Sequence, residues 1–149
     1  MRIEVPKDIS EAIGQISKFG REAWKAGDMT AAEESFLSAW KLIPDPKFDW
    51  DFYPQTMSRG LVEFYRDTAQ FTKARAWLET VRQAYLPTDE ASEATILFLE
   101  ATVDFDSEEL VSAFRKFETL YRLYKMRPFQ GENDKYKRFF SERLKKDKK

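Results

Sequence analysis

Charged side chains at helical spacing are the residues of this sequence best suited to chemistry. Arg59, Glu63 and Arg66 are spaced i, i+4 and i+7, which places them on one face of a predicted helix. Arginine can bind a carboxylate through two parallel hydrogen bonds, so this face could hold an acidic group of a ligand. The alternative is a ladder of ion pairs between neighbouring turns, which stabilises the helix and binds nothing.

A second group of charged residues is acidic. Residues 83–114 contain eight Asp or Glu and no Lys or Arg, whereas residues 115–149 contain thirteen bases and five acids. Glu93, Glu100 and Asp104 are spaced i, i+7 and i+11 on one predicted helical face. Such a stripe could meet a partner with a basic patch and speed association. The alternative is an ordinary solvated face.

An aromatic and acidic segment lies between two prolines, Pro46 and Pro54. Its residues are Phe48, Asp49, Trp50, Asp51, Phe52 and Tyr53. The four aromatic side chains could form an exposed recognition loop, or they could fill the gap between two helical hairpins. Asp49 and Asp51 do not indicate a glycosidase, because that chemistry requires two carboxylates across a sugar-binding cleft and nothing in the sequence indicates a cleft.

Composition argues against catalysis. The 149 residues include no Cys and no His, which excludes disulfides, thiol nucleophiles and histidine bases. The sequence contains no phosphate loop, dinucleotide fingerprint or nucleophile elbow. We therefore expect a protein that is not an enzyme, with no catalytic residue, no metal site and no cofactor.

Charge and hydropathy limit the partners and the location. A sequence pI of about 5.7 disfavours nucleic acid as the main ligand, although Lys145, Lys146, Lys148 and Lys149 form a basic end. The N-terminal residues lack the apolar run of a signal peptide, and no stretch approaches the ~18 apolar residues of a membrane span. We expect a cytoplasmic protein without a membrane partner.

Helical periodicity runs through most of the chain. Apolar residues at spacings of three and four, interrupted by Gly and Pro, predict seven helices at about residues 8–26, 30–43, 55–69, 71–85, 89–104, 108–126 and 134–145. The connections are short, so consecutive helices should be antiparallel neighbours. The predicted fold class is all-α, in a single domain.

The first two helices resemble a tetratricopeptide repeat. The residues that carry the resemblance are Ile16, Phe19, Gly20, Trp24, Gly27, Ala32, Phe36, Ala39 and Pro44. A second unit is recognisable from Leu61, Tyr65, Ala69, Ala74, Leu78, Val81 and Pro87. In a third, less regular unit, Ala113, Phe117 and Leu120 keep the spacing of the second helix, and its first helix should point Ala94, Phe98, Ala101 and Phe105 inward. An irregular helical bundle is the alternative.

The resemblance implies a right-handed stack of three antiparallel hairpins, at about residues 8–44, 55–86 and 89–127, with a capping helix at 133–146. It also implies that the first helix of each pair lines a concave groove. The groove residues would be Ser17, Arg21, Trp24, Lys25, Arg59, Glu63 and Arg66. The asparagines of family members that clamp a peptide C-terminus are missing from these helices, which disfavours a carboxylate clamp.

Three functions follow from these expectations, and each of them is the binding of another protein. The size of the chain and its PFQGENDKYKRFF segment (residues 128–140) resemble small tetratricopeptide-like immunity proteins. That resemblance implies inhibition of a toxin domain with a basic patch. The alternatives are a scaffold or adaptor that holds a peptide or helix in its groove, and a self-associating subunit that forms a homo-oligomer.

Overall fold

The computed structural model describes residues 3–147. The α-helices in this range are α1 (Lys7–Lys25), α2 (Met29–Leu42), α3 (Tyr53–Asp67), α4 (Phe71–Ala84), α5 (Glu90–Asp106), α6 (Leu110–Tyr124) and α7 (Asp134–Asp147). Two short 3-10 helices, η1 (Lys47–Asp49) and η2 (Arg127–Phe129), lie in the longer connections. The predicted all-α class is confirmed, and every helix begins and ends within a few residues of its predicted position.

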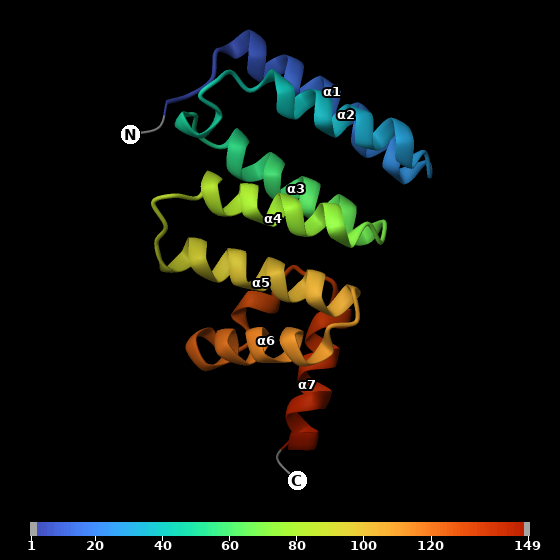
Figure 1. Cartoon of the computed structure of the whole chain (residues 1–149), viewed down its shortest axis with the longest axis vertical. Coiled ribbons are helices and arrows are strands. Elements are labelled where there is room, and N and C mark those ends of the chain that lie inside the picture. The colour runs from blue at the N-terminus through green and yellow to red at the C-terminus, as the bar shows by residue number, and fades with distance from the viewer. Residues whose placement is uncertain (1–2, 148–149) are drawn as a thin grey trace.

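The first six helices form three antiparallel pairs, α1 with α2, α3 with α4 and α5 with α6, which lie on one another as layers (Figure 1). The turns inside the first two pairs use left-handed backbone. Gly27 has a φ of 85°, and Ala69, which stands where the repeat has glycine, has a φ of 59°. The resemblance to the tetratricopeptide family and the right-handed twist of the stack stay predictions.

Small residues let the two helices of each pair approach closely. Ala32, Ala74 and Ala113 are fully buried at corresponding positions of α2, α4 and α6. Gly20 of α1 is buried opposite α2, where an added Cβ would lie 2.8 Å from a ring carbon of Phe36. A larger side chain at this position would require the Phe36 ring to shift or the two helices to move apart.

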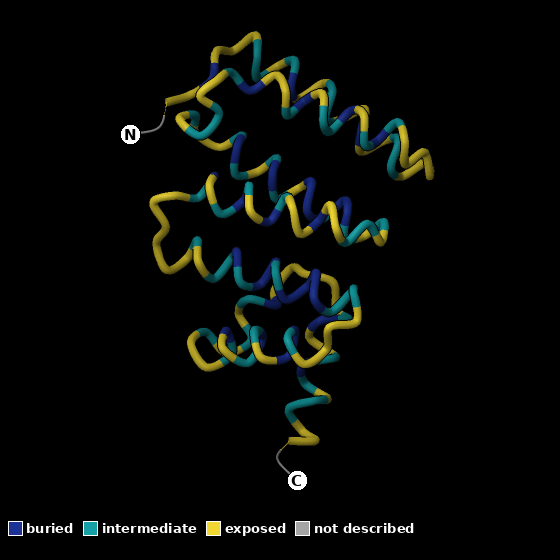
Figure 2. The backbone as a smooth tube through the Cα atoms, in the orientation of Figure 1, coloured by how far each residue is buried: buried dark blue, intermediate teal, exposed yellow. Residues whose placement is uncertain are grey.

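Helix α5 is buried on two sides, which makes it the centre of the fold (Figure 2). Ile96, Leu99 and Val103 face a cluster shared with α3 and α4. Phe98 and Ala101, two of the predicted inward positions, belong to a second cluster, where Ala94 and Phe105 also pack. A helix that is apolar around most of its circumference is typical of a buried element.

The end of the stack is covered by α7, which crosses α6 steeply (Figure 1). Tyr136 and Phe140 of α7 are fully buried against Phe98, Phe114 and Phe117 of the second cluster. Lys145 and Lys146 are exposed at the end of α7, and Lys148 and Lys149 lie outside the described residues. Within residues 3–147, none of the helices combines the length and the apolarity needed to cross a membrane.

Candidate functional site

Two adjoining pockets lie between the first helices of the three pairs. The smaller, of about 220 Å³, lies between α1 and α3, and the larger, of about 700 Å³, lies between α3, α5 and the segment after α6. Glu63 of α3 lines both, so we treat them as one groove. The smaller pocket is lined by Ser17, Arg21, Trp24, Phe36, Thr56, Met57, Gly60, Leu61 and Glu63. The larger is lined by Arg59, Glu63, Ala91, Ala94, Thr95, Phe98, Leu99, Tyr124, Arg127, Pro128 and Glu132.

The groove is hollow because small residues face it. Gly60 presents no side chain on the exposed surface of α3, and a Cβ there would meet nothing within 4 Å. Ala91 and Ala94 bring the backbone of α5 to the edge of the larger pocket. Its floor is apolar, since Phe98 and Leu99 are only 7% and 6% exposed. Such a surface can take up apolar groups of a ligand and hold them with a few polar contacts.

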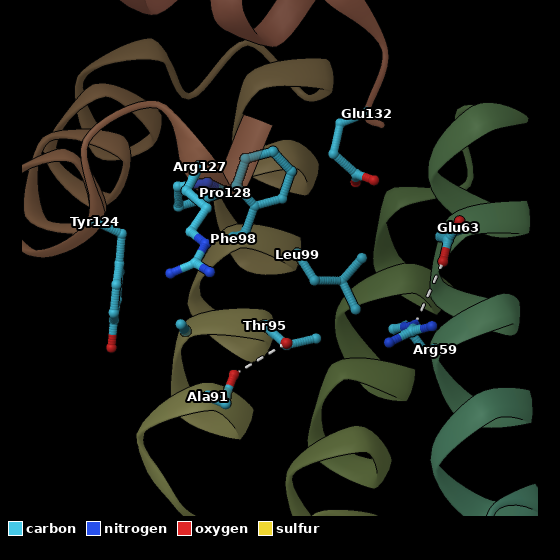
Figure 3. Close-up of a pocket in the computed structure, with 11 residues that line it drawn as sticks. Arg59, Glu63, Ala91, Thr95, Phe98, Leu99, Tyr124, Arg127, Pro128 and Glu132 are labelled. Atoms are coloured by element: carbon cyan, nitrogen blue, oxygen red, sulfur yellow. Dashed lines mark hydrogen bonds and ion pairs between the residues drawn. The ribbon is translucent and has the colours of Figure 1, made fainter. Parts of the chain in front are cut away.

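Two arginines and two glutamates, Arg59, Arg127, Glu63 and Glu132, line the larger pocket (Figure 3). On α3, Arg59 Nε lies 3.9 Å from the Glu63 carboxylate, and Arg59 also donates a 3.2 Å hydrogen bond to the Tyr85 hydroxyl. Glu132, from the loop before α7, is exposed and lies on the α3 side of the view, and its side chain has no hydrogen-bond or ion-pair partner among residues 3–147. Arg127 is also exposed and lies on the far side of Phe98 from α3.

The Glu63 carboxyl is in an unfavourable electrostatic position. Burial in the groove raises its pKa above the usual value; Arg66 and Arg59 oppose this rise, and Glu132 and Asp67 add to it. The side chain nevertheless remains 43% exposed, so a ligand can reach it.

Most of the predicted groove residues meet at this site. Ser17, Arg21 and Trp24 line the smaller pocket. Arg59 and Glu63, which belong to the predicted charged face of α3, line the larger pocket. Trp24 is also packed edge-on against Phe64, at a ring-centroid distance of 5.1 Å, so only part of it faces the groove. Lys25 lies on the exposed surface and lines neither pocket.

Arg66 was expected in the groove, and that expectation is wrong. Its side chain is only 10% exposed and points into the packing between α3, α5 and α7. It donates hydrogen bonds to Asp67 at 2.8 Å and to Thr102 at 3.0 Å, and its guanidinium lies 5.7 Å from the Tyr136 ring centroid. Arg59 and Arg66 lie on the same face of α3, but α5 and α7 cover the C-terminal end of that face, so Arg66 joins layers.

The predicted acidic stripe on α5 does not form. Asp104 is 2% exposed and accepts hydrogen bonds from Arg75 at 2.9 Å, from Ser112 at 2.7 Å and from Lys116. Burial alone would raise the pKa of Asp104, but these three donors outweigh burial and hold it below its usual value. Asp104 was expected on an exposed surface because a buried carboxylate is costly without partners; its partners come from α4 and α6.

Three other acids of this helix also accept hydrogen bonds or form ion pairs, and they differ in how many partners they have. Glu100 is paired with Arg82 of α4, and Asp106 accepts hydrogen bonds from Lys135 and Tyr136 of α7, both at 3.2 Å. Glu93 is exposed and accepts one 3.2 Å hydrogen bond from Thr88. We call this set of ion pairs the α5 ion network; its members are Asp104, Asp106, Arg66, Arg75, Lys116 and Lys135. Of the eight acids in the run without bases, three, Glu100, Asp104 and Asp106, form ion pairs with residues of other helices.

The aromatic segment at residues 48–53 mostly fills the gap between the first two hairpins. Trp50 and Tyr53 pack against the cluster of Ile13, Ala39 and Ile43, and the Trp50 indole donates a 2.8 Å hydrogen bond to the Pro44 carbonyl. Phe48 lies 6.4 Å from Trp40 between ring centroids. Asp49 and Asp51 are exposed, and Phe52, at 56% exposure, is the aromatic of this segment that faces solvent.

Several groove residues were missed by the sequence analysis. They are Ala91, Thr95, Tyr124, Arg127, Pro128 and Glu132. Tyr124 to Glu132 belong to the connection that folds back from α6 toward α7, and no periodic pattern places a connection against a particular helix. The proline and the 3-10 helix η2 turn this segment toward α5.

The chain was compared with models of protein families, with curated proteins and with solved structures, and none of the three comparisons finds a match.

Proposed function

We propose that this protein is a non-catalytic binding module that holds a segment of a partner protein in the groove across α1, α3 and α5. The observation that carries the proposal is the pair of adjoining pockets, of about 220 and 700 Å³, with an apolar floor and charged walls. Pockets of this size bind groups larger than one side chain. The resemblance to tetratricopeptide hairpins, whose first helices line a binding surface, supports the same function.

The distribution of charge favours the groove over the acidic face of α5 as the binding surface. The acidic-face hypothesis depended on Glu93, Glu100 and Asp104 being available together, and Asp104 is buried in the α5 ion network. The adaptor function therefore has more support than the inhibition of a toxin domain through a basic patch. Toxin inhibition, self-association and the cytoplasmic location stay predictions.

Filling the groove tests this function. A library of random twelve-residue peptides displayed on phage is selected on the wild-type protein after depletion on the variant Ala91→Trp. Ala91 is exposed at the edge of the larger pocket, so a tryptophan there obstructs the pocket without entering the core. Ala76→Trp is the matched control, because Ala76 is exposed on α4 and lines neither pocket.

We expect peptides that bind the wild type and Ala76→Trp with similar affinity and bind Ala91→Trp at least tenfold more weakly. Peptides that bind all three proteins equally, or no enriched peptides at all, would reject the groove as a binding site. Circular dichroism and denaturation midpoints of the two tryptophan variants establish that the comparison is made between folded proteins.

A further inference from the structure

Helix α3 runs between the two pockets of the groove. Gly60 and Leu61 of this helix line the smaller pocket, beside α1, and Arg59 lines the larger pocket, beside α5. Glu63 lines both pockets. A segment that occupies both pockets must therefore cross α3 near Glu63. Gly60 is exposed and precedes Glu63 by one turn on the same face of the helix, so the crossing passes over Gly60.

The fold itself does not require a glycine at position 60. The backbone of Gly60 is helical, and an added Cβ would meet no atom within 4 Å. By contrast, Gly27 and Gly131 have positive φ angles, and Gly20 is packed closely against α2. An exposed glycine inside a helix weakens that helix relative to alanine, because its backbone loses more conformational freedom on folding. Gly60 therefore lowers the stability of α3 without a packing reason.

The position of Gly60 distinguishes it from other open glycines. Gly14 of α1 is equally open, and it lines neither pocket, so an open glycine alone does not indicate a contact with a ligand. At Gly60 the missing side chain lowers the surface of α3 between two pockets. Glycine is favoured where a ligand approaches the main chain of a protein closely.

The charges of the groove are balanced, which limits the kind of occupant. The larger pocket is lined by Arg59, Arg127, Glu63 and Glu132, and the charged residues of the smaller pocket are Arg21 and Glu63. Neither lining carries a net charge, so a charged segment of either sign gains no net attraction. The apolar floor instead favours an occupant with apolar side chains.

The ion pair beside Gly60 suits the polar groups of a main chain. The side chains of Arg59 and Glu63 are 41% and 43% exposed, so a ligand can reach both. A main chain presents carbonyl acceptors and N–H donors together. Arg59 can donate to such a carbonyl, and Glu63 can accept from such an N–H.

We infer that the groove binds an uncharged, apolar segment of a partner protein in extended conformation, and that the main chain of this segment crosses α3 directly on Gly60. Apolar side chains on the two sides of the crossing enter the two pockets. An extended segment exposes its main chain, whereas a helix surrounds its main chain with side chains. This inference rests on the proposed function, because it names the class of segment that the groove binds and the point of closest contact.

The first test measures stability and binding for the same substitutions. Gly60→Ala should raise the urea denaturation midpoint of the free protein, because alanine favours the helix. The same variant should bind the peptides that depend on Ala91 several-fold more weakly, and Gly60→Leu should bind them at least about tenfold more weakly, because a side chain there holds the main chain away from α3. Gly14→Ala and Gly14→Leu are the matched controls and should leave peptide affinity unchanged.

The second test concerns the chemistry of the selected peptides. Each apolar residue of a peptide is replaced in turn by Lys and by Glu. At two positions both replacements should weaken binding at least about tenfold, because a charge would enter an apolar pocket. The affinity of the parent peptide should change by less than about twofold between about 50 and about 500 mM NaCl, because no net charge is screened.

The outcomes separate this inference from the function on which it rests. If peptides depend on Ala91 and bind Gly60→Leu as they bind the wild type, the groove is a binding site and the crossing at Gly60 is wrong. A lower denaturation midpoint for Gly60→Ala would also overturn the inference, because the glycine would then serve the fold. Tighter binding after replacement by Lys or by Glu, or a steep salt dependence, would overturn the uncharged occupant. If no peptide depends on Ala91, the proposed function fails and the inference fails with it.

Discussion

The groove and the α5 ion network each contain two carboxylates, but the two pairs differ in burial and in the number of hydrogen-bond donors that they meet. Asp104 is almost fully buried and meets donors from α4 and α6. Glu63 is 43% exposed, with one distant ion pair at 3.9 Å, and Glu132 has no partner among residues 3–147. The pKa of Asp104 is lowered and the pKa of Glu63 is raised. Acids that join layers are satisfied internally, and acids that face the groove are not.

This difference separates stability from binding. A buried carboxylate that meets several donors holds its neighbours in place, and removal of one member leaves unpaired charge. A carboxylate that is partly desolvated and poorly paired contributes little to the stability of the folded state. The two regions can be compared by replacing or deleting their residues and measuring stability. The variants below run from the largest expected loss of stability to the smallest.

Deletion of α7 from Asp134 onward should have the largest effect. It removes the fully buried Tyr136 and Phe140, and it removes Lys135, which forms an ion pair with Asp106. The loss of two buried rings costs on the order of 5 kcal/mol or more, which is comparable to the whole stability of a domain. We expect aggregation of the truncated protein, measured by size-exclusion chromatography with light scattering.

Deletion of residues 147–149 alone is the control for this truncation. Asp147 is exposed at the end of α7, so this shorter deletion should leave the denaturation midpoint unchanged. A monomeric long truncation with wild-type stability would show that α7 neither covers the second cluster nor completes the α5 ion network.

Asp104→Ala should have the next largest effect. It leaves Lys116 and Arg75 without their carboxylate in a partly buried site, and loss of one partner from a buried ion pair costs about 3 kcal/mol. Glu93→Ala, on an exposed face of the same helix, should change the free energy of unfolding by less than about 0.5 kcal/mol. Urea denaturation measures both. Equal effects at the two positions would remove the distinction between network acids and surface acids.

The sequence predicted the helices and much of the core because both follow from periodicity. The small residues Gly20, Ala32, Ala74 and Ala113 mark the helix crossings, and the structure buries all four. The inward positions on α5 were also predicted correctly at Phe98 and Ala101. These patterns are local, so they can be recognised without knowledge of which layers meet.

The sequence could not predict which charged residues are free. Asp104 and Arg66 were expected on accessible surfaces, but Asp104 is buried and Arg66 is largely covered, because partners distant in sequence, such as Lys116 and Tyr136, lie against them. Glu132 went unnoticed as a groove residue because it lies in a connection. Charge pairing between layers depends on the relative placement of helices, which the spacing of residues along one helix does not contain.

Acidification should affect the Asp104 site in a predictable direction. Because its folded pKa lies below the unfolded value, the ionised carboxylate stabilises the fold above the unfolded pKa, and this contribution is lost as pH falls through the folded pKa. The stability gap between the wild type and Asp104→Asn should therefore narrow on titration from pH 7 toward pH 3. The measurement is the free energy of unfolding of both proteins at each pH. A gap that stays constant would mean that Asp104 acts through shape and not through charge.

Glu63→Gln should have the smallest effect on stability, and its sign distinguishes the two regions. The folded pKa of Glu63 lies above the unfolded value, so this carboxyl favours folding below the unfolded pKa, and the contribution is lost as pH rises through the folded pKa. At pH 7 the ionised carboxylate therefore works slightly against the fold. The attraction of Arg66 and Arg59 is already contained in this net rise of the pKa.

The net effect on a half-exposed side chain is small because solvent screens its charge, so Glu63→Gln should leave the free energy of unfolding at pH 7 within about 0.5 kcal/mol of the wild type. Denaturation at pH 7 and near pH 4 measures the change, and the variant should gain stability relative to the wild type as pH rises. Glu93→Gln, with an exposed side chain, is the control. A cost above about 1 kcal/mol at pH 7 would mean that Glu63 is held internally, as Asp104 is.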